Sequence, residues 1–411
     1  METREKIVEI VKRIVLIIAI LIVIGWFTNS QKSPGGSPSP VPGTPAAAPT
    51  ASNPSPSPTA GNPNACNVAK LSKSAVQGLK VYSPGGDRYI INKEDDKGVG
   101  QIYVGTTGSA QLTCITCTQA AGGPKPDRFK MQPHWHPSGR WITMAVERDS
   151  YKTPPVLGLN RDYVEGQLQN GLWTNMWAVS PEGKNWTRLT DFRSESGYAD
   201  GYTGPAFTAD GRKLVWSQAV DGNILSYWPF GRWELTMADF TESGGVPKLS
   251  NLKNITPANM YWNEPGNFAP DGVSILLSGS TEKDAEGMDQ YILNVLTGKL
   301  TDLTNSPKVW DEHGIFSPSG QKVLFMSAYP YRDSADASKI TSIKTEFMLM
   351  NRDGSNLTQL THFRTDGYPE SSKGIAANGE WSLDGTSVNL RQLVFPNYVD
   401  WTLQFEGACG A

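Results

Sequence analysis

Cysteine, histidine and charge are all scarce in this chain. It has 411 residues, of which 4 are Cys and 4 are His, and only 19% are charged. Four cysteines are too few for a fold that is held together mainly by disulfides. Lys plus Arg (37) and Asp plus Glu (40) leave a formal charge of −3, so the basic excess of a nucleic-acid-binding protein is missing. We therefore expect no nucleic-acid partner.

Sequence motifs that carry familiar chemistry are missing as well. The chain contains no Gly-x-Ser-x-Gly elbow, no phosphate-binding Walker loop, no His-Glu-x-x-His and no dinucleotide fingerprint. Without such a constellation we predict no catalytic residue, no metal and no cofactor. Glycine (41), proline (29) and tryptophan (13) are instead abundant, and turn formers combined with aromatics favour β structure.

The N-terminal segment 1–29 is predicted to be a membrane anchor. Residues 14–27 form an unbroken apolar run, and residues 7–11 add apolar positions that can contact lipid from 7 to 27. The run is also short enough for a cleaved signal peptide, but its flank at 28–30 is a weak cleavage site. Basic residues are concentrated before the run, which predicts a single-pass protein with a cytoplasmic N-terminus and a periplasmic or extracellular remainder.

Residues 30–65 are predicted to be a linker. The segment is rich in Pro, Ser, Ala and Gly, and it cannot bury a hydrophobic core. Such a composition is typical of an extended, polyproline-like tether.

From residue 66 onward the sequence repeats itself. The repeat is an aromatic residue, three turn residues, a Gly and then an apolar strand. The turn residues and the Gly suit a tight turn, which predicts a hairpin at each copy. The copies begin at Tyr82, Trp135, Phe207, Phe268, Phe316 and Trp381.

A second hairpin follows most copies and ends in Leu-Thr, as in residues 347–361. Two hairpins per repeat make four strands, which is the blade of a β-propeller. The sequence therefore predicts an all-β, six-bladed propeller over residues 66–411.

The repeat resembles that of the TolB-type β-propellers. The resemblance rests on Phe-(Ser/Ala)-Pro-(Asp/Ser)-Gly and on the terminal Leu-Thr, and it covers residues 80–390. Several copies depart from it, because Thr208-Ala209 replaces Ser-Pro and Leu383 replaces Pro. The resemblance implies the fold and little about activity, since such propellers serve as binding platforms, enzyme gates and occasional lyases.

The four cysteines suggest two structural disulfides. Because the ends of a closed propeller meet, Cys66 and Cys409 are expected to pair, which leaves Cys114 and Cys117 to pair locally. Four cysteines allow three connectivities, so the other two pairings stay open.

A ring of polar residues is expected at the rim of the central channel. Residues just before each repeat aromatic are expected to lie in loops that precede the inner strands and to approach the channel, and they include His134, Glu264, Asp311, Glu312 and His313. These side chains could hold a cation or a cationic side chain. A solvated rim without a ligand is the alternative.

Aromatic residues in the same connecting segments are candidates for an interface. They are Tyr202, Tyr261, Trp262, Trp310 and Tyr368. Aromatics that gather on one face suit contact with protein or glycan. The alternative is that they seal neighbouring blades.

The leading functional hypothesis is a non-catalytic, membrane-tethered scaffold that binds another protein. It would act either as a scaffold of the envelope or as an accessory subunit of a membrane complex, which could be a respiratory, photosynthetic or envelope complex. The alternatives are a carbohydrate-active or metal-dependent lyase-like enzyme that uses the channel-rim His, Asp and Glu, and a sensor of a soluble ligand.

Overall fold

The computed structural model of the protein describes most of the chain from residue 66 onward. The described ranges are 66–149, 171–192, 200–221, 231–283, 285–306, 308–334, 337–339, 342–394, 397–407 and 409–410. The expected anchor (1–29) and linker (30–65) lie outside these residues. Within the described residues there is no helix with the length and hydropathy needed to span a membrane.

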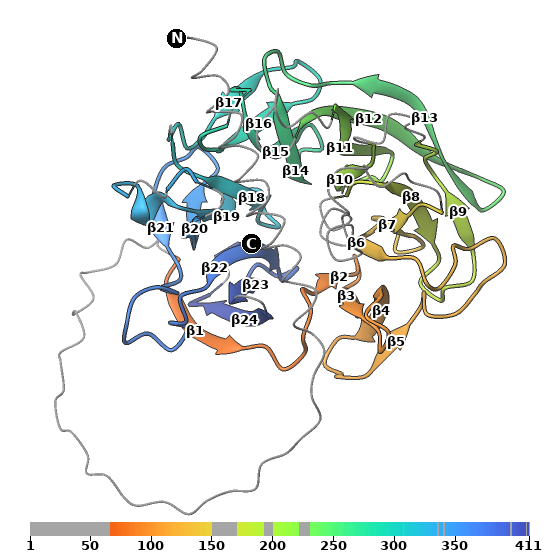
Figure 1. Ribbon diagram of the computed structural model, residues 1–411, viewed down its shortest axis with the longest axis horizontal. Helices are drawn as coiled ribbons and strands as arrows, with labels where there is room; N and C mark the ends of the chain where they lie inside the picture. The colour runs from red at the N-terminus through yellow and green to blue at the C-terminus, as the bar shows by residue number, and fades with distance from the viewer. Residues whose placement is uncertain are drawn as a thin grey trace, which may run out of the picture.

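The described residues form six four-stranded antiparallel sheets arranged in a ring, as Figure 1 shows. This confirms the all-β, six-bladed propeller that the repeats predict. In each sheet the strand that ends at the repeat aromatic is at one edge of the hydrogen-bonded order, and we call it the inner strand. The short 3-10 helix η1 (Tyr329–Tyr331) follows a strand of the fifth blade.

Blades one to three follow one another along the chain. Blade one contains β2 (Val81–Tyr82), β3 (Arg88–Glu94), β4 (Gly100–Thr106) and β5 (Leu112–Cys114). Blade two contains β6 (Lys130–Trp135), β7 (Ile142–Glu147), β8 (Thr174–Val179) and β9 (Trp186–Arg188). Blade three contains β10 (Tyr202–Phe207), β11 (Lys213–Asp221), β12 (Arg232–Ser243) and β13 (Val246–Asn254).

Blades four to six complete the ring. Blade four contains β14 (Trp262–Phe268), β15 (Ser274–Ser280), β16 (Asp289–Asn294) and β17 (Leu300–Asp302). Blade five contains β18 (Asp311–Phe316), β19 (Lys322–Ser327), β20 (Glu346–Asn351) and β21 (Thr358–Gln359). Blade six contains β22 (Ile375–Trp381), β23 (Ser387–Val394), β24 (Asn397–Phe405) and, at its outer edge, β1 (Val68–Lys73).

The turn of each repeat is stabilised by its own side chains. In blade three, Asp210 Oδ1 accepts hydrogen bonds from the Arg212 N–H at 3.0 Å and from the Thr208 hydroxyl at 2.7 Å. Gly211 has φ of 70°, a conformation that costs glycine little. The Asp-Gly pair therefore holds the tight turn that the sequence predicts.

The aromatic residues of the repeat pack between neighbouring blades. Phe316 is 1% exposed and shares a cluster with Leu276 of blade four and with Phe325 and Met348 of its own blade. Trp135 in the same way joins a cluster that includes Ile90 and Ile102 of blade one. The hydrophobic core is therefore a series of layers between blades, and it leaves the axis of the ring to polar residues.

The two ends of the propeller close the ring together. The N-terminal strand β1 pairs with the C-terminal strand β24, and Figure 1 shows the orange β1 beside the blue β24. The Cys66–Cys409 disulfide joins the residues next to these strands, with a Cα–Cα distance of 5.3 Å. Cys114 and Cys117 form the second, local disulfide. The structure thus contains both expected disulfides.

The inner strands of five blades are interrupted by a β-bulge. The register shifts once in each of β6, β10, β14, β18 and β22. A Gly, or a Pro, occurs at or beside each shift, because these residues tolerate a broken ladder. The bulges turn side chains of the inner strands away from the sheet and toward the neighbouring blade or the axis.

Candidate functional site: a polar belt along the inner strands

The polar residues expected at the channel rim belong to strands and not to loops. His134 is in β6, Glu264 is in β14, and residues 311–313 begin β18. The expectation that residues 311–313 lie in a loop before the strand is therefore wrong. The bulge allows the ladder of blade five to start at Asp311, five residues before the repeat aromatic.

Side chains of the inner strands are linked across five consecutive blades. Gln132 Nε2 donates to Thr203 Oγ1 at 3.2 Å, and Thr203 Oγ1 donates to Glu264 Oε1 at 3.3 Å. Glu264 Oε2 lies 3.5 Å from His313 Nε2, and His313 Nδ1 lies 3.2 Å from the carbonyl oxygen of Ala377, to which it can donate. We call these five residues the channel belt. It runs from blade two to blade six.

Two residues of the channel belt, Glu264 and His313, meet a third ligand-type side chain, that of Glu312. One ligand atom from each of Glu264, Glu312 and His313 lies within 4.8 Å of the other two. Glu312 accepts a hydrogen bond from Trp310 Nε1 at Oε2, at 2.9 Å. The side chains of His313 and Glu264 remain 24% and 20% exposed although they lie on inner strands, so solvent still reaches both of them.

The charges of this group are coupled. Burial alone would lower the pKa of His313, but the carboxylates of Glu312 and Glu264 outweigh it and raise that pKa above its usual value. Burial raises the pKa of Glu264, and the nearby His313 offsets only part of this effect. A proton or another cation is therefore stabilised between the imidazole and the two carboxylates.

Asp311 is not part of this group. It is 1% exposed and accepts hydrogen bonds from the hydroxyls of Ser306 and Ser327, each at 2.5 Å. Burial raises its pKa to about 7, although the two hydroxyl donors act in the opposite direction. Because side chains alternate along a strand, Asp311 points into the sheet interface and supports the start of β18.

His134 also lies apart from the three ligands. It belongs to blade two, which is three blades away from the blade of His313. Burial lowers the pKa of His134 to about 4, so its imidazole is neutral at neutral pH. The structure thus separates the expected ring: Glu264, Glu312 and His313 come together, whereas Asp311 and His134 do not join them.

Glu380 is an acidic residue that the sequence reasoning missed. It lies in β22 directly before the repeat aromatic, the position that His134 occupies in blade two. Burial raises its pKa to about 8. Gln132 and Thr203 were missed as well, since a lone Gln or Thr carries no motif. Alignment of the six repeats on their aromatic residues would have placed Thr203, Glu264 and Glu312 at one equivalent position.

The aromatic residues expected at an interface divide into two groups. Tyr202, Trp262 and Trp310 are 0%, 8% and 1% exposed, so the interface prediction is wrong for these three. They pack between neighbouring blades: Trp262 of blade four, for example, makes an edge-to-face contact with Trp233 of blade three, with the ring centroids 5.1 Å apart. Tyr261 is half-buried, and Tyr368 is 44% exposed and stacks on His362. Of these five aromatic residues, Tyr368 alone therefore presents a large surface to solvent.

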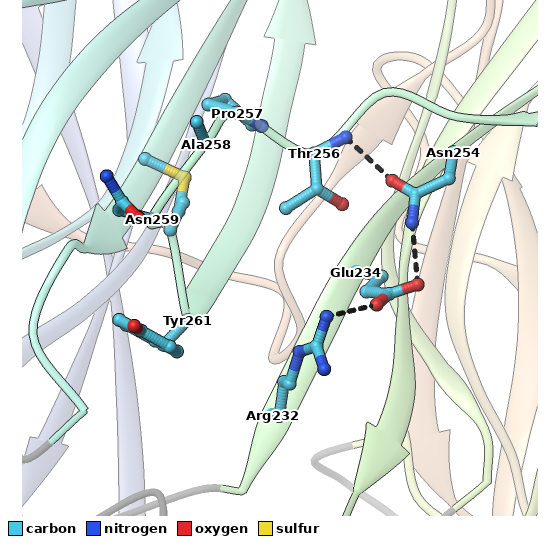
Figure 2. Close-up of a pocket in the computed structure, with 9 residues that line it drawn as sticks. Arg232, Glu234, Asn254, Thr256, Pro257, Ala258, Asn259 and Tyr261 are labelled. Atoms are coloured by element: carbon cyan, nitrogen blue, oxygen red, sulfur yellow. Dashed lines mark hydrogen bonds and ion pairs between the residues drawn. The ribbon is translucent and has the colours of Figure 1, made fainter.

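An open groove of about 560 Å³ lies beside the contact between blades three and four (Figure 2). Its polar wall is a chain of contacts in which Glu234 accepts from Arg232 and from Asn254, both at 2.6 Å. Figure 2 shows Tyr261 on the opposite side of the groove. The polar groups on its wall are already paired, so the groove offers few free groups to a ligand.

No family model matches the chain, and no curated protein is similar to it in sequence. Solved structures are similar in fold. A protein from Agrobacterium tumefaciens described as TolB has 16% identity and a TM-score of 0.47, over 69% of this chain and 80% of that one. An oligogalacturonate lyase from Vibrio parahaemolyticus has 12% identity and a TM-score of 0.43, over 84% and 92%.

The third structure is a prolyl endopeptidase, with 10% identity and a TM-score of 0.44. The match covers 79% of this chain but only 40% of the endopeptidase chain. These proteins differ in activity, so the similarity concerns the propeller alone.

Proposed function

We propose that this protein is a non-catalytic scaffold, tethered outside the membrane, that holds a protein partner through a basic segment at the axis of the propeller. The observation that supports the proposal is the surplus of acidic groups on the inner strands. These strands carry Glu264, Asp311, Glu312 and Glu380, and Lys130 is their one lysine or arginine.

Lys130 does not balance these acids at the axis. Its side chain is fully buried, and its ammonium group donates to the carbonyl oxygens of residues 125 and 126 at 2.9 and 2.8 Å. A cationic side chain of a partner would instead meet Glu380. Because burial keeps Glu380 protonated up to a pH of about 8, an arriving cation would lower its pKa and release a proton.

The binding proposal is tested with charged peptides and the full-length protein in detergent. We expect a fluorescent Lys-rich peptide to bind, with an affinity that falls as salt rises, and a Glu-rich peptide of equal length not to bind. Glu380→Gln should weaken binding several-fold, whereas Asp353→Asn, on an exposed outer turn, should not. Equal binding of both peptides, or normal binding by Glu380→Gln, would contradict the proposal. EDTA in every buffer excludes an effect of metal.

The tether places this scaffold at the outer face of the membrane, with residues 7–27 in lipid and the N-terminus in the cytoplasm. The support is the asymmetry of basic residues around the apolar run at 14–27. Protease added to spheroplasts should release a fragment that begins in the Pro-rich linker. Full protection of residues 66–411 would contradict this topology. If a partner complex exists, the propeller should co-purify with its membrane subunits as an accessory subunit.

A metal-dependent lyase-like enzyme is the second candidate, because Glu264, Glu312 and His313 are residue types that bind metal ions. The two candidate functions can be distinguished by incubating the protein with oligogalacturonate and a divalent metal ion. Formation of an unsaturated product that is lost in Glu312→Gln would favour the enzyme. Under the scaffold proposal no product forms.

A further inference from the structure

We propose that Glu264, Glu312 and His313 form a binding site for one Zn²⁺ ion at the axis of the propeller. The ligand atoms would be Glu264 Oε2, Glu312 Oε1 and His313 Nε2. The inference does not depend on the proposed function, because a zinc site could order the channel in a scaffold or act in catalysis.

The spacing of the ligand atoms suits an ion of this size. His313 Nε2 and Glu264 Oε2 are 3.5 Å apart. Two ligands that each lie about 2.1 Å from a tetrahedral Zn²⁺ are separated by about 3.4 Å. One ligand atom of Glu312 lies within 4.8 Å of these two, so a small rotation of its side chain would complete the third contact. The histidine favours zinc over Ca²⁺ and Mg²⁺, which prefer all-oxygen sites.

Each of the three ligands is oriented by an outer partner. His313 Nδ1 faces the carbonyl oxygen of Ala377, which fixes the proton on Nδ1 and leaves the lone pair of Nε2 for a metal. Trp310 Nε1 donates to Glu312 Oε2, and Thr203 Oγ1 donates to Glu264 Oε1. In each carboxylate one oxygen is thus hydrogen-bonded and the other is available. In known metal sites, hydrogen-bond partners of this kind orient the ligands and strengthen their binding of the metal.

The backbone of His313 supports the same conclusion. His313 is part of the β18 bulge and has φ of 55°, which is uncommon for a residue with a Cβ atom. Without the bulge, the alternation of side chains would place His313 and Glu312 on opposite faces of the strand. The bulge allows both of them to face Glu264. Three protein ligands leave a fourth position for water or for a group from a partner.

A proton is the alternative occupant of the same space. An imidazolium ion between two carboxylates would satisfy the same three side chains, and it needs no metal. The two occupants are distinguished by direct measurement of zinc.

The experiment is zinc titration of the metal-free, full-length protein by calorimetry, followed by dialysis and elemental analysis. We expect one zinc per chain, and we expect His313→Gln and Glu312→Gln each to weaken binding at least tenfold. The matched control is His362→Gln, because His362 also lies beside a carboxylate, with its Nδ1 3.8 Å from Glu370 Oε1, but belongs to no three-residue group among the described residues. It should bind zinc like the wild type.

Thr203→Val tests the outer shell without removing a ligand. We expect about tenfold weaker zinc binding. The metal-free variant should stay folded, with a modestly lower unfolding temperature because two hydrogen bonds are lost. Thermal unfolding of the two ligand variants shows whether each is folded, and Thr203→Val keeps the test decisive if one of them is not. No bound zinc in the wild type, or equal loss of zinc in His362→Gln and His313→Gln, would overturn the proposal.

Discussion

At the scale of single residues, His134 shows how the packed interior controls a charge. It lies on an inner strand, and burial lowers the pKa of its imidazole to about 4, compared with 6.5 in an unfolded chain. Between these values the unfolded chain binds a proton that the folded protein does not bind. The contribution of His134 to the stability of the fold should therefore fall as the pH decreases from about 6.5 to about 4.

The contribution of His134 can be isolated with His134→Gln, which cannot be protonated. From pH 7 to pH 5 we expect the free energy of unfolding of the wild type to fall by about 2 kcal/mol more than that of the variant. Urea unfolding at the two pH values measures this difference. If the wild type and the variant lose equal stability, the imidazole of His134 is not shielded as the structure indicates.

Phe316 shows the part that a repeat aromatic plays in packing. It fills the layer between blades four and five, and Arg352 lies over its ring at 5.3 Å from the centroid. Phe316→Ala should lower the free energy of unfolding by about 3–5 kcal/mol, because it leaves a cavity between two blades. Tyr368→Ala is the matched control, since Tyr368 is 44% exposed and its loss should lower the free energy of unfolding far less. A small effect of Phe316→Ala on the urea midpoint would contradict this assignment.

At the scale of strands, the bulges bring neighbouring inner strands very close together. A Cβ atom on Gly266 in β14 would lie only 1.9 Å from the carbonyl oxygen of Gly314 in β18. A Cβ on Gly314 would meet Gln290 Oε1 at 1.8 Å. Glycine is required at these two positions because there is no room for a Cβ atom. The backbone dihedral angles do not require it, since neither residue has a positive φ.

Gly266→Ala should therefore destabilise the protein by about 3 kcal/mol, because the clash is with backbone that cannot rotate away. Gly272→Ala is the control. Gly272 lies in the next turn with φ of 70° and open space around it, so this substitution should lower the free energy of unfolding by only about 1 kcal/mol. Thermal or urea unfolding of the two variants gives the comparison, and a milder effect for Gly266→Ala than for Gly272→Ala would refute the close approach.

The same strands show what the sequence could and could not predict. The aromatic-turn-Gly repeat determines how many blades form and where each inner strand ends, because those signals are local. The bulges are also marked locally, by Gly or Pro, but their effect on side-chain direction depends on the neighbouring blade. For this reason Glu264 and Glu312 could be proposed together, and alignment of the repeats would have added Thr203, whereas the separation of Asp311 from them could not be predicted. Burial of Tyr202 likewise depends on packing between blades, which no local pattern shows.

At the scale of the whole molecule, closure of the ring depends on one strand and one disulfide. β1 pairs with β24 from Val68–Phe405 to Lys73–Trp401, and the Cys66–Cys409 bond joins residues 343 positions apart. A covalent link over so long a loop restricts the unfolded chain strongly. The local Cys114–Cys117 bond, with a separation of 3, restricts it much less.

Replacing both Cys66 and Cys409 with Ala should lower the free energy of unfolding by about 5 kcal/mol in the chain-entropy account. The double variant at Cys114 and Cys117 should lose clearly less. Denaturant unfolding under non-reducing conditions compares the two. Equal losses would mean that ring closure does not depend on the terminal disulfide, and peptide mapping that links Cys66 to Cys114 would contradict the pairing itself.

The position of this disulfide also determines how the protein responds to mechanical force. A pull on the chain that precedes Cys66 reaches the propeller at the start of β1, an edge strand that could otherwise be peeled from β24 one hydrogen bond after another. With the bond intact, the tension passes through sulfur to Cys409, which lies beside Cys66 in space but near the other end of the chain. The six blades then bear the load as a closed loop. Once this single bond is reduced, the same tension would separate β1 from β24 and open the ring.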